Sequence, residues 1–236
     1  MSLHALRWRL VDAPDSWGAR RRGRRWQWLT ETFPELAEMS VLDLGGRVET
    51  WQQAPVRARH VHVVNLEPLP PELPEWAEAD HADACALPAR IAQRRYDLVF
   101  SNSVIEHVGG HERRLRFAEA VRSLAGAYWV QTPYRYFPVE PHWVAPAMQF
   151  LPVAARARLA HRWPLAHTPS PDRATALESV LWTELLDRTQ LRHYFPDATL
   201  RAERTLGLTK SLVAVRGGRC PDRLPSVPVS RARHHG

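Results

Sequence analysis

The 236-residue sequence has only two cysteines and no long apolar segment, and each absence excludes a class of protein. Cys85 and Cys220 cannot form the framework of a disulfide-rich secreted domain, so we expect a reducing, cytoplasmic environment. No uninterrupted apolar run reaches the roughly 18 residues that a membrane helix requires, so we expect no membrane span. The N-terminus shows no apolar stretch followed by a cleavage site, and we expect no signal peptide.

Lysine is almost absent, although the chain is basic. Lys210 is its single lysine, whereas the formal net charge is +7. The arginines are spread along the chain except at residues 20–25, where five of six residues are arginine. A nucleic-acid-binding surface requires a basic stripe with interleaved aromatic residues, and this short cluster beside Trp26 and Trp28 supplies little of one. We expect no nucleic-acid partner and keep RNA binding as an alternative.

The residues that are present fit one α/β domain. A hydrophobic fraction of 44% is enough for a buried core, and the length suits a single domain with a modest insertion. Short apolar runs that predict buried strands alternate with segments of helical spacing. These runs cover residues 40–44, 60–66, 96–101 and 127–131. The alternation predicts a doubly wound, mostly parallel, Rossmann-like sheet with helices on both faces.

Apolar residues at helical spacing also place elements before and after these strands. Such spacing predicts a helix over residues 20–39 with a bend near Pro34. Leu177, Leu181 and Leu185 predict one apolar face of a later helix. Two closing strands are then expected near 199–203 and 211–215.

Residues 132–172 differ from the rest, because they are rich in proline, aromatic residues and histidine without a strand period. We interpret them as an insertion over the carboxyl edge of the sheet. Residues 217–236 are rich in proline and arginine, and we expect a disordered tail there. Residues 1–216 are therefore predicted to form one domain, and the sequence does not specify an oligomeric state.

Four short segments, in order along the chain, form a recognisable set. They are VLDLGG at 41–46, VVNLE at 63–67, DACALP at 83–88, and the segment 96–108 that runs from YDLVFSN to EHV. Together they resemble the four motifs of class I S-adenosylmethionine-dependent methyltransferases. Residues 131–142 more loosely resemble a subgroup of these enzymes that acts on small molecules. The resemblance implies that the chain binds S-adenosylmethionine and transfers its methyl group.

The first two motifs imply a turn that approaches the cofactor. By the resemblance, Asp43, Gly45 and Gly46 contact it and Glu67 binds its ribose hydroxyls. Glycine permits a close approach of the backbone, and Glu67 lies about two dozen residues past Asp43, near the spacing of a ribose-binding acid. A nicotinamide cofactor would require G-x-G-x-x-G, which is missing because Arg47 follows Gly46. An ordinary strand-ending turn and a solvated loop acid are the alternatives.

The third and fourth motifs imply the remaining cofactor contacts. Asp83 and Ala84 would meet the adenine, and Asn102 would lie beside the methionine end. A helix-capping role is the alternative for Asp83, and a side chain without function is the alternative for Asn102.

Two histidines stand where an acceptor hydroxyl can lose a proton. His107 follows the fourth motif, and His142 belongs to the predicted insertion. Histidine titrates near neutrality and is the natural general base, so both are candidate catalytic residues. Packing for His107 and loop capping for His142 are the alternatives.

A metal site is a further alternative at this place. Some methyltransferases hold a divalent ion with E-x-x-E-H, and Glu106 and His107 match the end of that pattern. Glu140 and His142 would offer other ligands if the insertion folds down. Ser103 stands at the first glutamate of the pattern. With that acid missing, we expect no metal.

The sequence therefore predicts a methyltransferase for a small-molecule acceptor. The methylated group is expected to be a hydroxyl of a natural product, a sugar or a lipid-linked glycan. Two alternatives stay open: an RNA or protein methyltransferase, indicated by residues 20–25, and an inactive cofactor-binding domain, indicated by Arg47 in the first turn.

Overall fold

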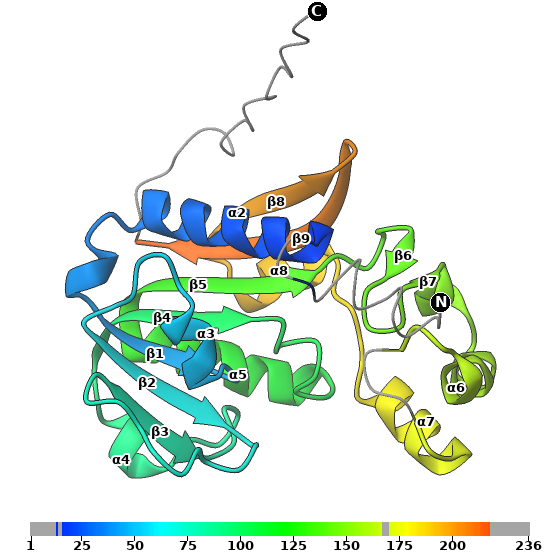
Figure 1. Cartoon of the computed structure of the whole chain (residues 1–236), viewed down its shortest axis with the longest axis horizontal. Coiled ribbons are helices and arrows are strands. Elements are labelled where there is room, and N and C mark those ends of the chain that lie inside the picture. Colours follow the sequence, from blue (N-terminus) through cyan, green and yellow to red (C-terminus); the bar gives the residue numbers. More distant parts are fainter. Residues whose placement is uncertain (1–12, 14–15, 167–169, 218–236) are drawn as a thin grey trace, which may run out of the picture.

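The computed structural model describes residues 13, 16–166 and 170–217 (Figure 1). The helices are α2 (Trp17–Thr32), α3 (Val48–Gln52), α4 (Ala89–Ala92), α5 (His111–Leu124), α6 (Val153–Arg162), α7 (Arg173–Leu181) and α8 (Arg188–Tyr194). The strands are β1 (Ser40–Leu44), β2 (His60–Asn65), β3 (Ala77–His81), β4 (Tyr96–Asn102), β5 (Ala125–Pro133), β6 (Val139–Glu140), β7 (Ala145–Pro146), β8 (Thr199–Thr205) and β9 (Leu208–Arg216). Two single 3-10 turns are η2 (Leu36–Glu38) and η3 (Met148–Phe150). Most of the predicted tail, residues 218–236, lies outside the described residues.

A seven-stranded sheet has the order β3-β2-β1-β4-β5-β9-β8. The strands from β3 to β5 are parallel, whereas β9 runs antiparallel to both β5 and β8. The order reverses between β1 and β4, which creates the switch point outside whose carboxyl ends doubly wound folds bind ligands. The predicted Rossmann-like sheet is therefore confirmed.

Helices cover both faces of this sheet (Figure 1). One face packs against α2 and α3, and the other against α4, α5 and α8. Side chains along β1 alternate between the two layers, with Val41 in the first and Leu42 in the second. Both positions are fully buried, which explains why this strand is mostly apolar in the sequence, with Asp43 as the buried exception. No helix among the described residues is long and apolar enough to cross a membrane.

The first described helix is shorter than predicted. The side chain of Ser16 caps α2 by accepting a hydrogen bond from the Ala19 amide (3.0 Å). The helix ends at Thr32, and η2 follows separately, so the predicted helix over 20–39 is interrupted rather than bent, at the place where the bend near Pro34 was expected. The reason is Pro34, which lacks an N–H donor and disfavours helical backbone at the preceding residue.

Strand β3 has no counterpart among the predicted strands. Its sequence AEADH lacks an apolar run, and none of its residues is fully buried. It pairs only with β2 at the margin of the sheet, where charged side chains are tolerated and discourage pairing with other chains.

The insertion forms a small unit beyond the carboxyl ends of the parallel strands (Figure 1). Strands β6 and β7 form a hairpin, and α6 packs against α7. Its core is separate from the two layers of the sheet and contains Trp143, Met148, Ala160, Ala176 and Val180. Both predicted bounds, 132 and 172, lie too early in the sequence, because β5 continues to Pro133 and α7 ends only at Leu181.

The three leucines that predicted one helix face are separated by the structure. Leu185 lies after α7 and is 5% exposed, whereas Leu177 and Leu181 on α7 are 40% and 60% exposed. We therefore expect Leu185→Ala to lower the free energy of unfolding by about 2–5 kcal/mol. Leu177→Ala and Leu181→Ala should each change it by less than about 0.5 kcal/mol. Urea unfolding measures all three, and equal losses would contradict the placement of α7.

Asp43 on β1 is a carboxyl group inside the core, at 1% exposure. One oxygen accepts a hydrogen bond from Trp51 Nε1 (2.8 Å), and the other has no partner among the described residues. Burial raises the pKa of Asp43 to about 7, although the Trp51 bond opposes this shift. Between pH 4 and 7 the folded chain therefore holds a proton that the unfolded chain has lost, and stability falls as the pH rises.

Asp43→Asn removes this titration and keeps an acceptor for Trp51. We expect the variant to gain stability relative to the parent chain as the pH rises from about 4 to about 7. The gain should be about 1.4 kcal/mol for each unit by which the pKa is raised. Urea unfolding at several pH values measures it, with the exposed Glu75→Gln as the control. A constant difference across this range would show that Asp43 does not titrate there.

Candidate active site

The turn after β1 contains two glycines, so backbone without side chains lies at the switch point of the sheet. Gly45 has φ +78°, and a Cβ atom there would lie 2.5 Å from Val104 Cγ2, so no other residue fits. Gly46 lies directly against the Asp43 carboxylate. The Asn65 side chain at the end of β2 donates a hydrogen bond to the Gly46 carbonyl (2.8 Å), which fixes the turn.

Two acidic side chains follow β2 and β3 at the same edge. The Glu67 carboxylate is half exposed and forms an ion pair with Arg47 from the first turn. Asp83 accepts hydrogen bonds from the Cys85 amide (2.9 Å) and from Arg113 of α5 (2.8 and 3.0 Å). Partial burial opposes ionisation of Asp83, but these bonds prevail and lower its pKa. Both acids lie on the rim of a cleft.

This cleft has a volume of about 300 Å³. It is lined by four of the residues that the sequence predicts as cofactor contacts: Gly45, Glu67, Asp83 and Ala84. His107 lines it as well. Residues from four separate loops thus meet at one cavity, because parallel strands end at the same edge of the sheet.

The other predicted contacts lie around the cleft rather than on its wall. Gly46 lines a neighbouring cavity, and Asp43 is buried beneath the turn. The Asn102 side chain accepts a hydrogen bond from Arg25 of α2 (2.7 Å). Ser103, which the sequence did not indicate as a contact, lines the cleft instead.

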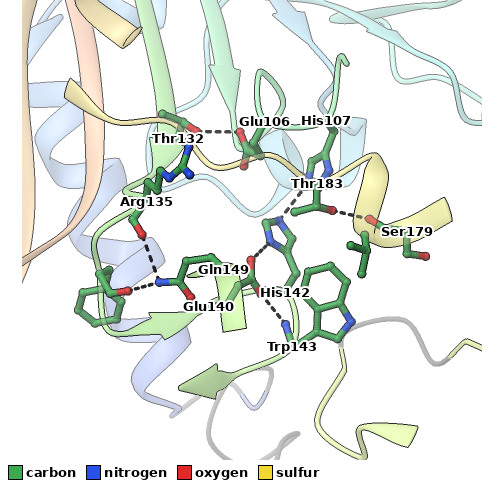
Figure 2. Close-up of polar contacts among 12 residues, drawn as sticks. Glu106, His107, Thr132, Arg135, Glu140, His142, Trp143, Gln149, Ser179 and Thr183 are labelled. Carbon is green, nitrogen blue, oxygen red and sulfur yellow. Dashed lines mark hydrogen bonds and ion pairs between the residues drawn. The ribbon is translucent and has the colours of Figure 1, made fainter. Parts of the chain in front are cut away.

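The two predicted catalytic histidines lie against each other, although 35 residues separate them (Figure 2). Their Nε2 atoms are 3.0 Å apart. His142 Nδ1 is 2.7 Å from an oxygen of Glu140, which is buried and also accepts hydrogen bonds from the backbone N–H groups of His142 and Trp143. His107 Nδ1 lies 3.3 Å from the Trp182 carbonyl oxygen. Each imidazole is thus oriented through Nδ1.

The two imidazoles differ in basicity. Burial, together with the neighbouring His142, lowers the pKa of His107 to about 4. Burial also disfavours charge on His142, but its hydrogen bond to Glu140 prevails and raises its pKa. Burial raises the pKa of Glu106 to about 7, and Thr132 donates a hydrogen bond to this carboxyl group (3.0 Å). When the pair takes up one additional proton, His142 is therefore the ring that becomes charged.

A second cavity of about 600 Å³ lies between the sheet edge and the insertion. Its wall includes His142 and Trp143 from the insertion. Ser103, His107 and Trp182 line both this cavity and the cleft, so the two spaces adjoin at these side chains. The imidazole pair stands at that junction.

Two residues of the site had no signal in the sequence. Arg113 lies on α5, and Trp182 follows α7, far along the chain from the motifs that they contact. Only the tertiary structure brings them to the site, because each lies in a segment of ordinary composition. Ser103 lies inside the fourth motif, but its role as a cleft residue was not predicted; it adopts φ +59° and donates a hydrogen bond to the Gln131 side chain (2.9 Å).

Two of the five arginines at residues 20–25 engage the sheet. Arg25 forms an ion pair with Glu203 of β8 (2.8 Å), and the mostly buried Arg21 lies 3.9 Å from the same carboxylate. Part of this charge thus serves to dock α2 against the sheet.

No protein-family model matches the sequence, and no curated protein matches it. Solved structures resemble it in fold. A Listeria monocytogenes protein, provisionally described as an S-adenosylmethionine-dependent methyltransferase, has a TM-score of 0.52 at 11% identity. The alignment covers 84% of this chain and 99% of that protein.

Two other solved structures are similar to the same degree. A Rhodobacter sphaeroides protein, provisionally described as a Zn-dependent alcohol dehydrogenase, has a TM-score of 0.52 at 14% identity and 92% coverage of both chains. An exported protein of Bordetella parapertussis, again a provisional description, has a TM-score of 0.51 at 12% identity. The alignment covers 92% of this chain and 79% of that protein. At these identities the likeness shows the fold, and the chain has the doubly wound Rossmann-like fold of these proteins.

Proposed function

We propose that the chain is an S-adenosylmethionine-dependent methyltransferase for a small-molecule acceptor. The observation that carries the proposal is the meeting of two cavities at His107, beside the switch point of the sheet. Methyl transfer requires a donor and an acceptor in line at one point, and two adjoining cavities provide separate places for them. The Listeria monocytogenes protein of similar fold supports the choice of donor.

The cleft has the features that this donor requires. The bare turn at Gly45 and Gly46 permits close approach, with Asp43 supporting it from beneath. In the proposal, Glu67 binds the ribose hydroxyls, which requires its carboxylate to accept bonds besides that from Arg47. Asp83 and Ala84 then meet the adenine.

The methionine end of the cofactor would extend toward the second cavity. Asn102 contributes backbone there, since its side chain is engaged by Arg25. The cofactor supplies the reactive methyl sulfonium, and the protein supplies orientation and the exclusion of water.

The acceptor would occupy the cavity beneath the insertion. Its wall combines Trp143 and Trp182 with the hydroxyl groups of Ser179 and Thr183, which suits a small molecule with apolar and polar parts. We propose O-methylation of a hydroxyl group, with His107 and His142 as the residues that contact it. Glu140 would stabilise the positive charge that the pair carries after it takes a proton.

Calorimetry with S-adenosylmethionine and its demethylated product tests the donor site. We expect one-to-one binding, weakened at least about tenfold by Glu67→Ala, because charged hydrogen bonds contribute about 1.5–3 kcal/mol each. The matched control is Glu72→Ala, an exposed acid of the same loop, which should bind normally. Absence of heat with both ligands would refute the proposal, whereas binding without label transfer to any component of a metabolite extract would leave an inactive binding domain.

A further inference from the structure

The imidazole pair has an unusual arrangement of lone pairs. The Trp182 carbonyl and the Glu140 carboxylate accept hydrogen bonds, so each Nδ1 carries the hydrogen. In the neutral rings the Nε2 lone pairs of His107 and His142 then point at each other across 3.0 Å. Two lone pairs at this distance repel unless a cation lies between them, and that cation is a proton or a metal ion.

A carboxyl group with an unpaired oxygen lies beside the pair. Glu106 is fully buried, and its Oε1 has no hydrogen-bond partner among the described residues. Ligand atoms of Glu106, His107 and His142 all lie within 4.8 Å of one another (Figure 2). A buried polar atom without a partner is costly, so this oxygen favours a hydrogen-bond donor or a cation beside it.

The surrounding charge favours a cation. Glu106 and Glu140 both act on His142, and Arg156 opposes them. When both acids are ionised, the surroundings of His142 carry two negative charges and one positive charge, so their net charge is negative. Arg156 is itself engaged with the carbonyl oxygens of Thr183 and Val180 (3.1 and 3.4 Å) and makes no hydrogen bond to either acid.

We propose that His107 Nε2, His142 Nε2 and the Glu106 carboxylate form a site for a divalent transition-metal ion such as Zn²⁺. Donor atoms around a tetrahedral ion lie about 3.3 Å apart, so the imidazoles need to separate only slightly and the carboxylate to approach. Glu140 and the Trp182 carbonyl orient the two rings through Nδ1, as outer partners do in metal sites. This proposal replaces the expectation of no metal, which rested on Ser103 alone.

Three protein ligands leave a coordination position open, as in catalytic zinc sites. His107 and His142 both line the acceptor cavity, so the open position faces it. This role rests on the proposed function: the ion would bind the acceptor hydroxyl and lower its pKa. With both Nε2 lone pairs bound to the ion, the imidazoles no longer accept the proton, so it passes to solvent instead of to the pair. The acceptor oxygen bonds to the methyl carbon, and the carbon–sulfur bond breaks with its electron pair kept by sulfur.

A second cluster of possible metal ligands is already paired with arginine side chains. His62, Glu78 and Asp80 also lie within reach of one ion. Their acids, however, already form ion pairs with Arg94 and Arg90 (2.8 and 2.6 Å). Protein cations thus fill that cluster, and we expect one metal ion per chain rather than two.

The test uses the full chain freed of metal with a chelator and then titrated with Zn²⁺ or Co²⁺ alone. We expect one ion per chain and, with Co²⁺, the visible d–d absorption of a low-coordinate site. His107→Ala and His142→Ala should each weaken Zn²⁺ binding by more than about 100-fold, and Glu140→Gln by about 10–100-fold. His193→Ala changes an exposed histidine of α8 that lines neither cavity, and this control should bind as the parent does.

Circular dichroism of the metal-free variants separates loss of a ligand from loss of the fold, and Glu140→Gln keeps the test open if an alanine variant unfolds. Absence of a Co²⁺ spectrum, or Zn²⁺ affinity unchanged in folded His107→Ala and His142→Ala, would overturn the site. Calorimetry with S-adenosylmethionine on the same preparations distinguishes the two proposals. Cofactor binding without metal binding refutes only the metal site, and metal binding without cofactor binding refutes only the proposed donor.

Discussion

The parallel pairing of β1 with its two neighbours is the constraint on which the rest of the structure depends. Asp43 lies level with Val63 of β2 on one side and with Phe100 of β4 on the other. Because the three strands run in one direction and in this register, their loops leave from the same edge. Three motifs that are far apart in the sequence therefore converge, and β3 adds the fourth through its pairing with β2.

The second constraint is the contact between that edge and the insertion. Glu106 and His107 come from the loop after β4, whereas Glu140 and His142 come from the hairpin of β6 and β7. The Glu184 amide also donates a hydrogen bond to the Glu106 carbonyl (2.9 Å) beyond α7. The imidazole pair thus supplies the reactive groups and also connects the insertion to the sheet edge. A change at either histidine therefore affects both the chemistry and the position of the insertion.

The buried strands were predictable because their residues face apolar layers on both sides and form short, mostly apolar runs. Strand β3 was not, since its charged side chains follow from its place at the sheet margin rather than from local preference. The cleft residues Gly45, Glu67 and Asp83 were found because each follows directly on a strand. Arg113 and Trp182 reach the site only through tertiary packing, and the exposure of Leu181 shows that helical spacing alone does not say which face is buried.

Donor and acceptor are proposed to meet at the imidazole pair, and a crystal structure with the demethylated cofactor would show whether they can. We expect the adenosyl group in the cleft between Gly45, Glu67 and Asp83. We also expect the sulfur within roughly 8 Å of His107 Nε2, close enough for an acceptor oxygen between them. A ligand bound elsewhere, or a sulfur directed away from both imidazoles, would contradict this proposal.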